Sequence, residues 1–240
     1  MPRRVKKKFY GSHDIRSEVT SVIAHQLKTP MAGIKSSLEV VLSGQLGEIT
    51  NEQREYLQIA LDETGRMIAM VKDLLDAARI DQKELKLKVQ LTDLVKLVKD
   101  SIDNLSTFAR ATNTAVSFKV DGQIPLVKID ATKIQQVINN IIDNAIHYQR
   151  KKGDIRVRLS REGKKIIFSC QDNGIGVTKE ESRNIFTKFY RGQRAVELVP
   201  MGSGLGLFIA SAIIRQSGGK VWFTAAPEQG SIFYFFLPVK

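Results

Sequence analysis

One histidine has a setting that suggests chemistry, in the segment AHQLKTP at residues 24–30. The apolar residues around this segment recur every three or four positions, which is typical of an amphipathic helix. His25 and Thr29 fall on the polar face of that helix, one turn apart. His25 is therefore expected to face solvent. An ordinary surface histidine is the alternative, because an exposed ring needs no partner.

Pro30 favours a functional interpretation of this histidine. Inside a helix, a proline removes one backbone hydrogen bond and presses on the carbonyl one turn earlier, at a cost of about 3 kcal/mol. That carbonyl belongs to Gln26, directly after His25. We expect the helix to bend beside an exposed titratable group, which suggests function rather than packing. The other histidines, His13 and His147, do not stand at the spacing of a metal site.

A second polar cluster lies in the segment QQVINNIIDNAIHY, residues 135–148. Asn140, Asn144 and His147 recur there at helical spacing, opposite an apolar face. Asparagine is a poor helix former, so its repetition within a helix asks for a reason. An amide oxygen suits Mg²⁺, which keeps most of its waters and bridges to phosphates. The alternative is an ordinary polar helix surface.

Two glycine-rich segments follow. In DNGIG, Asp172 stands at the end of a predicted strand, and Gly174 and Gly176 would let the backbone approach a ligand closely. A simple turn is the alternative. The segment GSGLGL, residues 202–207, leads directly into a helix whose N-terminus can bind phosphate. It lacks the glycine pattern and preceding strand of a dinucleotide fingerprint, and it lacks the Lys-Ser/Thr pair of a P-loop.

The elements that carry these residues fall into two groups. Residues 15–80 contain two apolar helical stripes, and Thr50 with Gln53 forms a capping box at the start of the second. Because a two-helix hairpin cannot bury two wide stripes, we infer a homodimeric four-helix bundle. After Asp81, alternating strand and helix patterns indicate a two-layer α/β domain.

Several boundaries in the second group are specific expectations. They are a strand in ELKLKVQL (84–91), a helix capped by Thr92 and running from Asp93 to about Ala111, strands in AVSFKV and PLVKI, a helix capped by Asp130 and running to about Arg150, a hairpin turning near Gly163, a helix near Leu205 to Ser217, and two closing strands.

Composition narrows the possible partners. The net charge of the 240 residues is +12, and five of the first eight residues are basic. That cluster could bind nucleic acid or anionic lipid, but the other basic residues are spread along the chain, so we expect no nucleic-acid partner. No apolar run is long enough to span a membrane, and no signal peptide is recognisable. The single cysteine, Cys170, is expected to be a buried thiol in a reducing cytoplasm.

The segment AHQLKTP resembles the phospho-acceptor box of sensor histidine kinases, commonly Ser-His-acid-Leu-basic-Thr-Pro. The resemblance implies that His25 receives a phosphoryl group and that Thr29 helps to position water for dephosphorylating a partner. The family usually has Glu or Asp directly after the histidine, where this chain has Gln26. An amide can accept a hydrogen bond and orient the ring, but it cannot take up a proton at neutral pH.

The later segments resemble the nucleotide-binding boxes of the same kinases, in the same order. The N box implies that Asn140 is a Mg²⁺ ligand, that Asn144 and His147 lie at the phosphates, and that the Tyr148 ring lies against the base. In the first glycine box, Asp172 would accept a hydrogen bond from the adenine amino group. The glycine-box residues implied to line the nucleotide are Gly174, Gly176, Gly202, Gly204, Leu205 and Gly206.

Between the glycine boxes, IFTKFYRG resembles the F box of these kinases. Phe186 and Phe189 would be packing residues, and Arg191 could face the phosphates. The stretch after it, GQRAVELVPM, would form a lid over the nucleotide.

The resemblance covers roughly residues 15–238. It implies a basic N-terminal tail or linker at 1–14, a dimerisation and phosphotransfer hairpin at 15–83, and an ATP-binding catalytic domain of the histidine-kinase, gyrase and Hsp90 type at 84–240. The implied activity is ATP- and Mg²⁺-dependent phosphorylation of His25, followed by transfer to an aspartate of a response regulator. It also implies the cytoplasmic part of a larger sensor, with possible membrane attachment through a preceding region.

Three alternatives stay open from the sequence. With Gln26 in place of an acid, the protein could act mainly as a phosphatase of its regulator. It could be a degenerate signalling scaffold, although the intact Asn140, Asp172 and glycine boxes argue against that. A mechanochemical ATPase would share the nucleotide fold but would have no use for the histidine hairpin.

Overall fold

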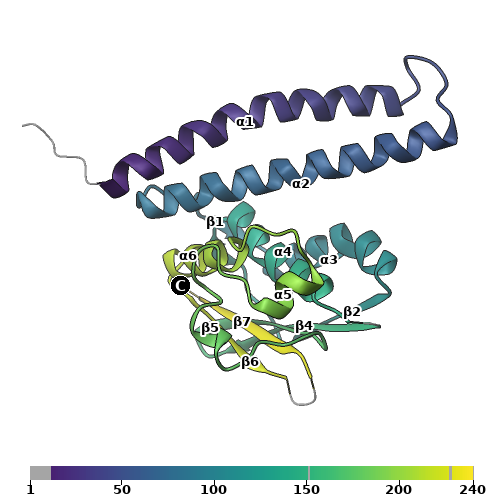
Figure 1. Cartoon of the computed structure of the whole chain (residues 1–240). Helices are drawn as coiled ribbons and strands as arrows, with labels where there is room; N and C mark the ends of the chain where they lie inside the picture. Colours follow the sequence, from purple (N-terminus) through teal and green to yellow (C-terminus); the bar gives the residue numbers. More distant parts are fainter. Residues whose placement is uncertain (1–11, 151, 227–228, 240) are drawn as a thin grey trace, which may run out of the picture. The chain divides into compact units, whose positions relative to one another are not determined.

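The computed structural model describes residues 12–150, 152–226 and 229–239, without the side chains of residues 12–21 and His25. The chain divides between Leu85 and Lys86 into two compact units, which are described separately (Figure 1). Of the predicted tail at 1–14, residues 12–14 belong to the first helix and the rest lie outside the described residues.

The first unit is the predicted helical hairpin, formed by α1 (Ser12–Leu42) and α2 (Asn51–Asp81). The capping box at α2 is confirmed, because Gln53 N donates to Thr50 Oγ1 (3.1 Å) and Thr50 N donates to Gln53 Oε1 (2.9 Å). α1 continues through Pro30 as one helix. This element therefore presents the His25 segment on a helix, as the sequence predicts.

The hairpin holds a small apolar cluster of its own. Ala24, Met31 and Val71 are buried, with partly buried side chains of α2 packed against them. Four side chains of the apolar stripe of α1 are exposed instead: Val22 (52%), Ile23 (50%), Leu27 (45%) and Ile34 (54%). The three- and four-residue spacing of apolar residues predicts the two helices correctly. The contact between the helices is filled by the small Ala24 and the flexible Met31.

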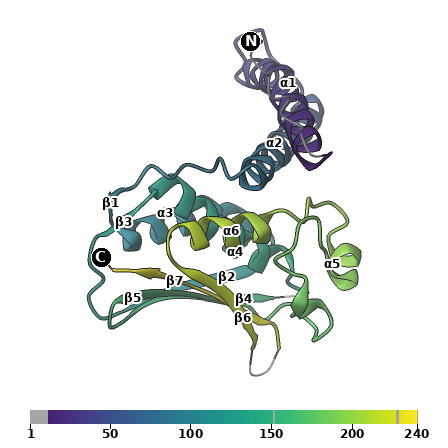
Figure 2. The same ribbon diagram turned by 90° about the vertical axis from the view of Figure 1, so that its left-hand side faces the viewer.

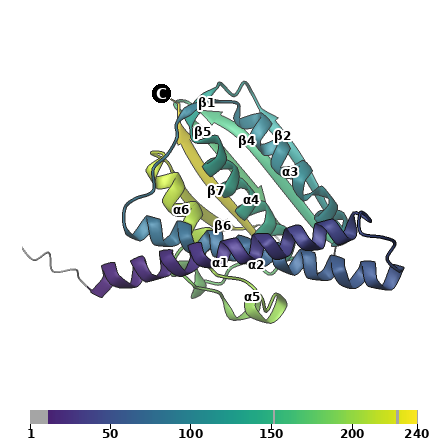
Figure 3. The same ribbon diagram turned by 90° about the horizontal axis from the view of Figure 1, so that it is seen from above.

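The second unit is a two-layer α/β domain, as predicted. Its five-stranded sheet has the order β2-β4-β5-β7-β6, with β2 and β4 parallel and the other pairs antiparallel. The strands are β2 (Thr114–Asp121), β4 (Gly153–Glu162), β5 (Lys165–Gln171), β6 (Lys220–Ala225) and β7 (Ser231–Pro238). Helices α3 (Leu94–Ala111), α4 (Ala131–His147) and α6 (Gly206–Gln216) lie along one face of this sheet (Figures 2 and 3).

Smaller elements complete this unit. A separate pair joins β1 (Gln90–Thr92) to β3 (Val127–Ile129), and a short helical turn, η1 (Glu181–Arg183), and a short helix, α5 (Gln193–Leu198), lie between β5 and α6. No helix in the described parts of the chain is long and apolar enough to cross a membrane.

The core of the second unit lies between the sheet and the three helices. Phe168 on β5 and Phe235 on β7 are fully buried, and their rings stack with centroids 4.7 Å apart. Ile138 and Ile141 of α4 are buried as well. Cys170 is buried on β5, which raises the pKa of its thiol well above the usual range. This core fixes α4 and the end of β5, which carry most of the candidate nucleotide residues.

Three expected boundaries are wrong. Within residues 84–91 only the end is a strand, because β3 offers just three residues for pairing and Lys88 N instead donates to Asp130 Oδ2 (2.7 Å). The cap of α3 is Asp93, not Thr92, and its side chain accepts a hydrogen bond from Lys96 N (3.1 Å). α4 is capped by Asp130 as predicted, but it ends at His147 rather than near Arg150. The hairpin turn at Gly163 is confirmed.

Candidate functional site

Asp172 is a buried carboxylate at the end of β5, with one oxygen held by the protein. It is 7% exposed, and its Oδ1 accepts hydrogen bonds from Gly174 N (2.9 Å) and Ser231 N (3.2 Å). Its Oδ2 accepts none from the described residues, so this oxygen can accept from a ligand. Burial raises the pKa of the carboxyl group, and the two N–H donors partly oppose that rise.

The first glycine box brings Asp172 against the end of α4. A Cβ on Gly174 would lie 2.4 Å from the main-chain oxygen of Tyr148, and Ile175 N donates to that same oxygen (3.0 Å). Gly176 has a φ of +69°, a conformation that favours glycine. Only a residue without a side chain at position 174 can pass so close to Tyr148, while a Cβ on Gly176 would lie 3.1 Å from the main-chain oxygen of Gly230. The structure thus brings together Asp172, Gly174, Gly176 and Tyr148, as the sequence predicts for one wall of a nucleotide site.

Asn140 joins α4 to the second glycine box. Its Nδ2 donates to the main-chain oxygen of Gly206 (3.2 Å), at the start of α6. Its amide oxygen accepts no hydrogen bond within the described chain, which leaves it for a hard cation. Asn144, one turn further along α4, is also half-buried. No group of three or more metal-binding side chains (His, Cys, Asp or Glu) occurs among the described residues, so a metal here would depend on amide and phosphate oxygens.

The second glycine box forms the entry to α6. Gly204 has a φ of +66°, and a Cβ there would lie 2.8 Å from the carbonyl carbon of Phe189. Leu205 is buried and its N–H donates to Ser203 Oγ (3.2 Å), after which α6 begins at Gly206. The first N–H groups of a helix have no partner within it and favour an anion. This geometry suits a phosphate group.

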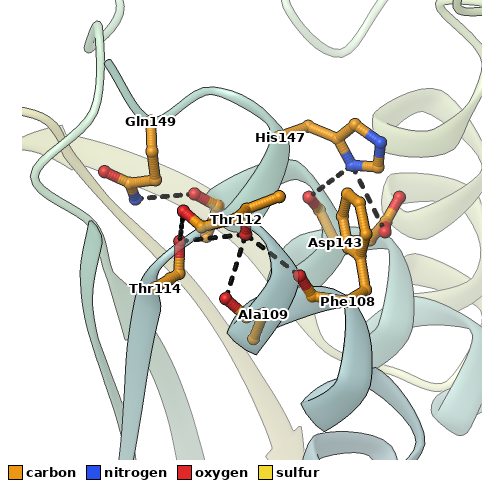
Figure 4. Close-up of polar contacts among 8 residues, drawn as sticks. Phe108, Ala109, Thr112, Thr114, Asp143, His147 and Gln149 are labelled. Carbon is orange, nitrogen blue, oxygen red and sulfur yellow. Dashed lines mark hydrogen bonds and ion pairs between the residues drawn. The ribbon is translucent and has the colours of Figure 1, made fainter. Parts of the chain in front are cut away.

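His147 lies at the last turn of α4, where two groups orient its ring (Figure 4). Its Nδ1 donates to the main-chain oxygen of Asp143 (3.0 Å) and lies 3.3 Å from Asp143 Oδ1. The ring also packs beside Phe108 of α3, with centroids 4.6 Å apart. Below it, Thr112 Oγ1 donates to carbonyls that close α3 and contacts Thr114 Oγ1 (3.2 Å). The ring is therefore held at the junction of two helix ends.

The F box differs from expectation at Phe189. Phe189 is 63% exposed and has a φ of +60°, so the prediction that it is a packing residue is wrong. The chain reverses there, which turns the ring outward, while Ile185 takes the buried position. Arg191 directs its guanidinium at main-chain carbonyls of the predicted lid.

Lys188 is a candidate that the sequence reasoning missed. Its ammonium lies 5.2 Å from the centroid of the Phe208 ring, on the first turn of α6. Burial lowers the pKa of this ammonium. FTKFYRG contains two cations, Lys188 and Arg191, and their order in the sequence does not tell which one lies beside the helix N-terminus.

The candidate acceptor segment lies in the first unit, on α1. Gln26, Thr29 and Pro30 are exposed there, and the side chain of His25 is outside the described part. The expected solvent exposure of that ring therefore stays a prediction. All the candidate nucleotide residues belong to the second unit.

The comparisons with known proteins cover both units. Residues 15–83 match the family described as His Kinase A (phospho-acceptor) domain, and residues 129–240 match the family described as Histidine kinase-, DNA gyrase B-, and HSP90-like ATPase. The chain belongs to the sensor histidine kinases. The sensor histidine kinase WalK of Bacillus subtilis (strain 168) is 31% identical to it, over 94% of this chain and 37% of WalK.

Solved structures of histidine kinases share its fold. The catalytic domain of histidine kinase ThkA is 28% identical, with a TM-score of 0.57, over 63% of this chain and 95% of that domain. Full-length ShkA in complex with AMPPNP is 24% identical, with a TM-score of 0.74, over 92% of this histidine kinase chain and 45% of ShkA. The chain spans 25% to 60% of the length of the curated relatives that it matches.

Proposed function

We propose that this chain is the catalytic core of an ATP-dependent protein-histidine kinase that phosphorylates His25 and passes the phosphoryl group to an aspartate of a response regulator. The observation that carries the proposal is Asp172, a buried carboxylate with one oxygen fixed by backbone N–H groups and one left to accept. An acceptor of this kind suits the amino group of adenine, whereas guanine would present a carbonyl at the same position.

The residues around Asp172 suit the rest of a nucleotide. Tyr148 would lie against the base, and Asn140 would hold Mg²⁺ through its amide oxygen. When bound, Mg²⁺ would neutralise charge on the phosphates. Further phosphate contacts would come from Asn144, His147, Lys188 and the N–H groups of Gly202, Gly204, Leu205 and Gly206. Each group adds positioning or positive charge, which is the main protein contribution to phosphoryl transfer.

On α1, His25 would act as the nucleophile. One ring nitrogen forms a bond to the γ-phosphorus as the bond from phosphorus to the leaving oxygen of ADP breaks. The other nitrogen carries a proton as positive charge grows on the ring. Gln26 would orient that ring by hydrogen bonding, and Thr29 would position water for hydrolysis of the aspartyl phosphate on the regulator, which releases inorganic phosphate.

Two partners follow from this activity. Four exposed apolar side chains on α1 (Val22, Ile23, Leu27 and Ile34) support a homodimer in which two hairpins form a four-helix bundle. ThkA, which shares the fold at 21% identity and a TM-score of 0.61, has been solved in complex with the response regulator protein TrrA. We infer the same class of partner here, together with a cytoplasmic location for this core.

A labelling experiment tests the proposal. The chain is incubated with Mg²⁺ and ATP labelled at the γ-phosphate, and the bound label is tested in acid and in alkali. A phosphohistidine is lost in acid and survives alkali. His25→Ala should abolish the label and leave ATP affinity nearly unchanged, while His13→Ala is the matched control that keeps both. Undiminished labelling of the His25 variant would exclude it as the acceptor.

A further inference from the structure

Arg191 lies near the end of the F box, directly before the segment expected to form the lid (residues 192–201). These residues together with Gly202 are here called the lid segment. Its Nη1 donates to two carbonyls of this segment, at 2.9 and 3.5 Å, and its Nη2 donates to two more. The four acceptors are the main-chain oxygens of Ala195, Val199, Pro200 and Gly202. A single guanidinium thus joins the last turn of α5 to the chain that follows it.

Apart from the contacts of Arg191, one side chain of the lid segment makes a polar contact with the rest of the described domain: Arg194 Nη2 donates to the main-chain oxygen of Gly176 (3.4 Å) and lies 3.8 Å from Glu181 Oε2. α5 has six residues, none of them buried, and no side chain caps its N-terminus. A helix of this length is not stable by itself, and the carbonyls of its last turn have no partner within it. The fork geometry of arginine can satisfy several carbonyls at once, and the positive charge strengthens each hydrogen bond. Arg191 therefore supplies four hydrogen bonds to the main chain of this segment, against one from Arg194 to Gly176.

The same guanidinium reaches the phosphate-binding loop. A Cβ on Gly202 would lie 3.2 Å from Arg191 Cζ and 3.4 Å from its Nε, so this glycine leaves room for the guanidinium. Two residues later, Gly204 packs against the backbone of Phe189. The F box and the second glycine box thus pack directly against each other, with the Arg191 side chain beside Gly202.

The contacts of Arg191 differ from those of a side chain held ready for phosphate. All of its hydrogen-bonding partners in the described chain are neutral carbonyls, and no carboxylate there pairs with it. Its Nε is buried and makes no hydrogen bond with the described residues. Turning the guanidinium towards a phosphate would break the contacts that order the lid segment.

We propose that Arg191 is a positioning residue that holds the lid segment and the second glycine box in their nucleotide-binding arrangement, and that it does not bind phosphate itself. The consequence for ATP rests on the proposed function, because it assumes that this segment covers the nucleotide. The order of the lid segment does not rest on it and can be measured without nucleotide. If only a fraction of molecules keeps the segment ordered, the apparent Kd rises by the inverse of that fraction.

The first test compares amide hydrogen exchange of the full chain and two variants without nucleotide. Arg191→Lys keeps the positive charge but places its donors on one nitrogen, which cannot span the four carbonyls. Arg191→Ala removes the charge and the donors. We expect faster exchange in residues 193–204 of both variants, with unchanged exchange in the sheet. Arg183→Ala, an exposed arginine in η1, is the matched control and should leave the lid unchanged. Unchanged lid exchange in both Arg191 variants would overturn the proposal.

The second test separates positioning from phosphate binding. A positioning role predicts that both Arg191 variants weaken ATP and ADP alike, by roughly tenfold each if a tenth of molecules stays ordered. A phosphate ligand predicts a loss confined to ATP, largely rescued by lysine, with normal lid exchange, and that result would refute us. If neither the parent chain nor any variant binds ATP, the proposed function is refuted. The hydrogen-exchange result on the order of the lid segment is unaffected by that outcome.

Gly202→Ala tests the contacts of the guanidinium without replacing Arg191. Its added methyl would press on the guanidinium and should loosen the same amides as Arg191→Ala. In a double-mutant cycle, Gly202→Ala should add no further increase in lid exchange once Arg191 is alanine. Additive effects of the two changes would contradict a shared mechanism. This cycle also decides the question if Arg191→Ala alone lowers the stability of the whole domain.

Discussion

Replacing Asp172 with asparagine should separate the two tasks of this side chain. In the structure, Oδ1 accepts from Gly174 N and Ser231 N, and the asparagine Oδ1 can keep both hydrogen bonds. The new Nδ2 would stand where Oδ2 now lies, so that a donor replaces an acceptor. The backbone should stay in place, while the group that faces the base changes from a hydrogen-bond acceptor to a donor.

The loss in ATP affinity follows from that change. A hydrogen bond to a charged group contributes roughly 1.5–3 kcal/mol, which corresponds to roughly a 10- to 150-fold weaker Kd. A donor at this position should instead suit a purine with a carbonyl at C6. The variant should therefore lose affinity for ATP and lose little or none for ITP. Titration calorimetry with both nucleotides measures the two constants.

The same substitution should raise stability without ligand, with a defined pH dependence. Burial raises the pKa of Asp172 above the unfolded value of about 3.9. The stability tied to the protonated carboxyl is therefore fully present below the unfolded pKa and is lost as the pH rises through the folded pKa. The asparagine side chain does not ionise, so the variant does not lose this stability as the pH rises. The difference in melting temperature between variant and parent should grow as the pH rises from about 4 and then level off.

The control is Asp154→Asn, which removes an exposed carboxylate that pairs with Arg156 on the sheet. It should change neither nucleotide preference nor the pH dependence of melting by a comparable amount. Equal losses for ATP and ITP in Asp172→Asn, or unchanged ATP affinity, would refute the assignment of Asp172 to the base.

Three further variants test other parts of the argument. Gln26→Glu should raise the rate of self-phosphorylation roughly tenfold or more in single-turnover assays, because a carboxylate can take up the ring proton; no acceleration would show that proton removal is not limiting. Leu27→Glu, on the exposed stripe of α1, should turn a sedimenting dimer into a folded monomer, and a persistent dimer would place the interface elsewhere. Gly174→Ala should lower the free energy of unfolding by about 1–3 kcal/mol because its methyl meets the Tyr148 oxygen, whereas Gly65→Ala, with open space in α2, should raise it by about 0.5–1 kcal/mol in the same denaturant titration.

The fold was largely predictable because its helices and strands carry strong periodic patterns. The errors came where two neighbouring residues had the same capability or where pairing depended on a distant strand. Thr92 and Asp93 can both cap a helix, and only the backbone geometry selects Asp93. The alternation in residues 84–91 fits a strand, yet the short β3 limits the ladder to three pairs.

The candidate site was predictable as a set of residue types, but not in its contacts. The sequence gives no sign that Asn140 donates to Gly206 or that Oδ2 of Asp172 is the available oxygen, because both depend on the packing of distant segments. The roles of Lys188 and Arg191 were hidden for the same reason. Two cations three residues apart look alike until one is seen beside α6 and the other among the lid carbonyls.

The two hydrogen bonds between Asp172 and Ser231 have a consequence for the order in which the protein is made. Asp172 N donates to Ser231 O (2.9 Å), and Ser231 N donates back to its carboxylate, across 59 residues of chain. β7, which begins at Ser231, is also the strand that pairs with β5 on one side and β6 on the other. Chains grow from the N-terminus and domains fold as units. A nascent chain that already contains every glycine box therefore still lacks a fixed Asp172, and it gains the ability to bind nucleotide only when its last strand is added.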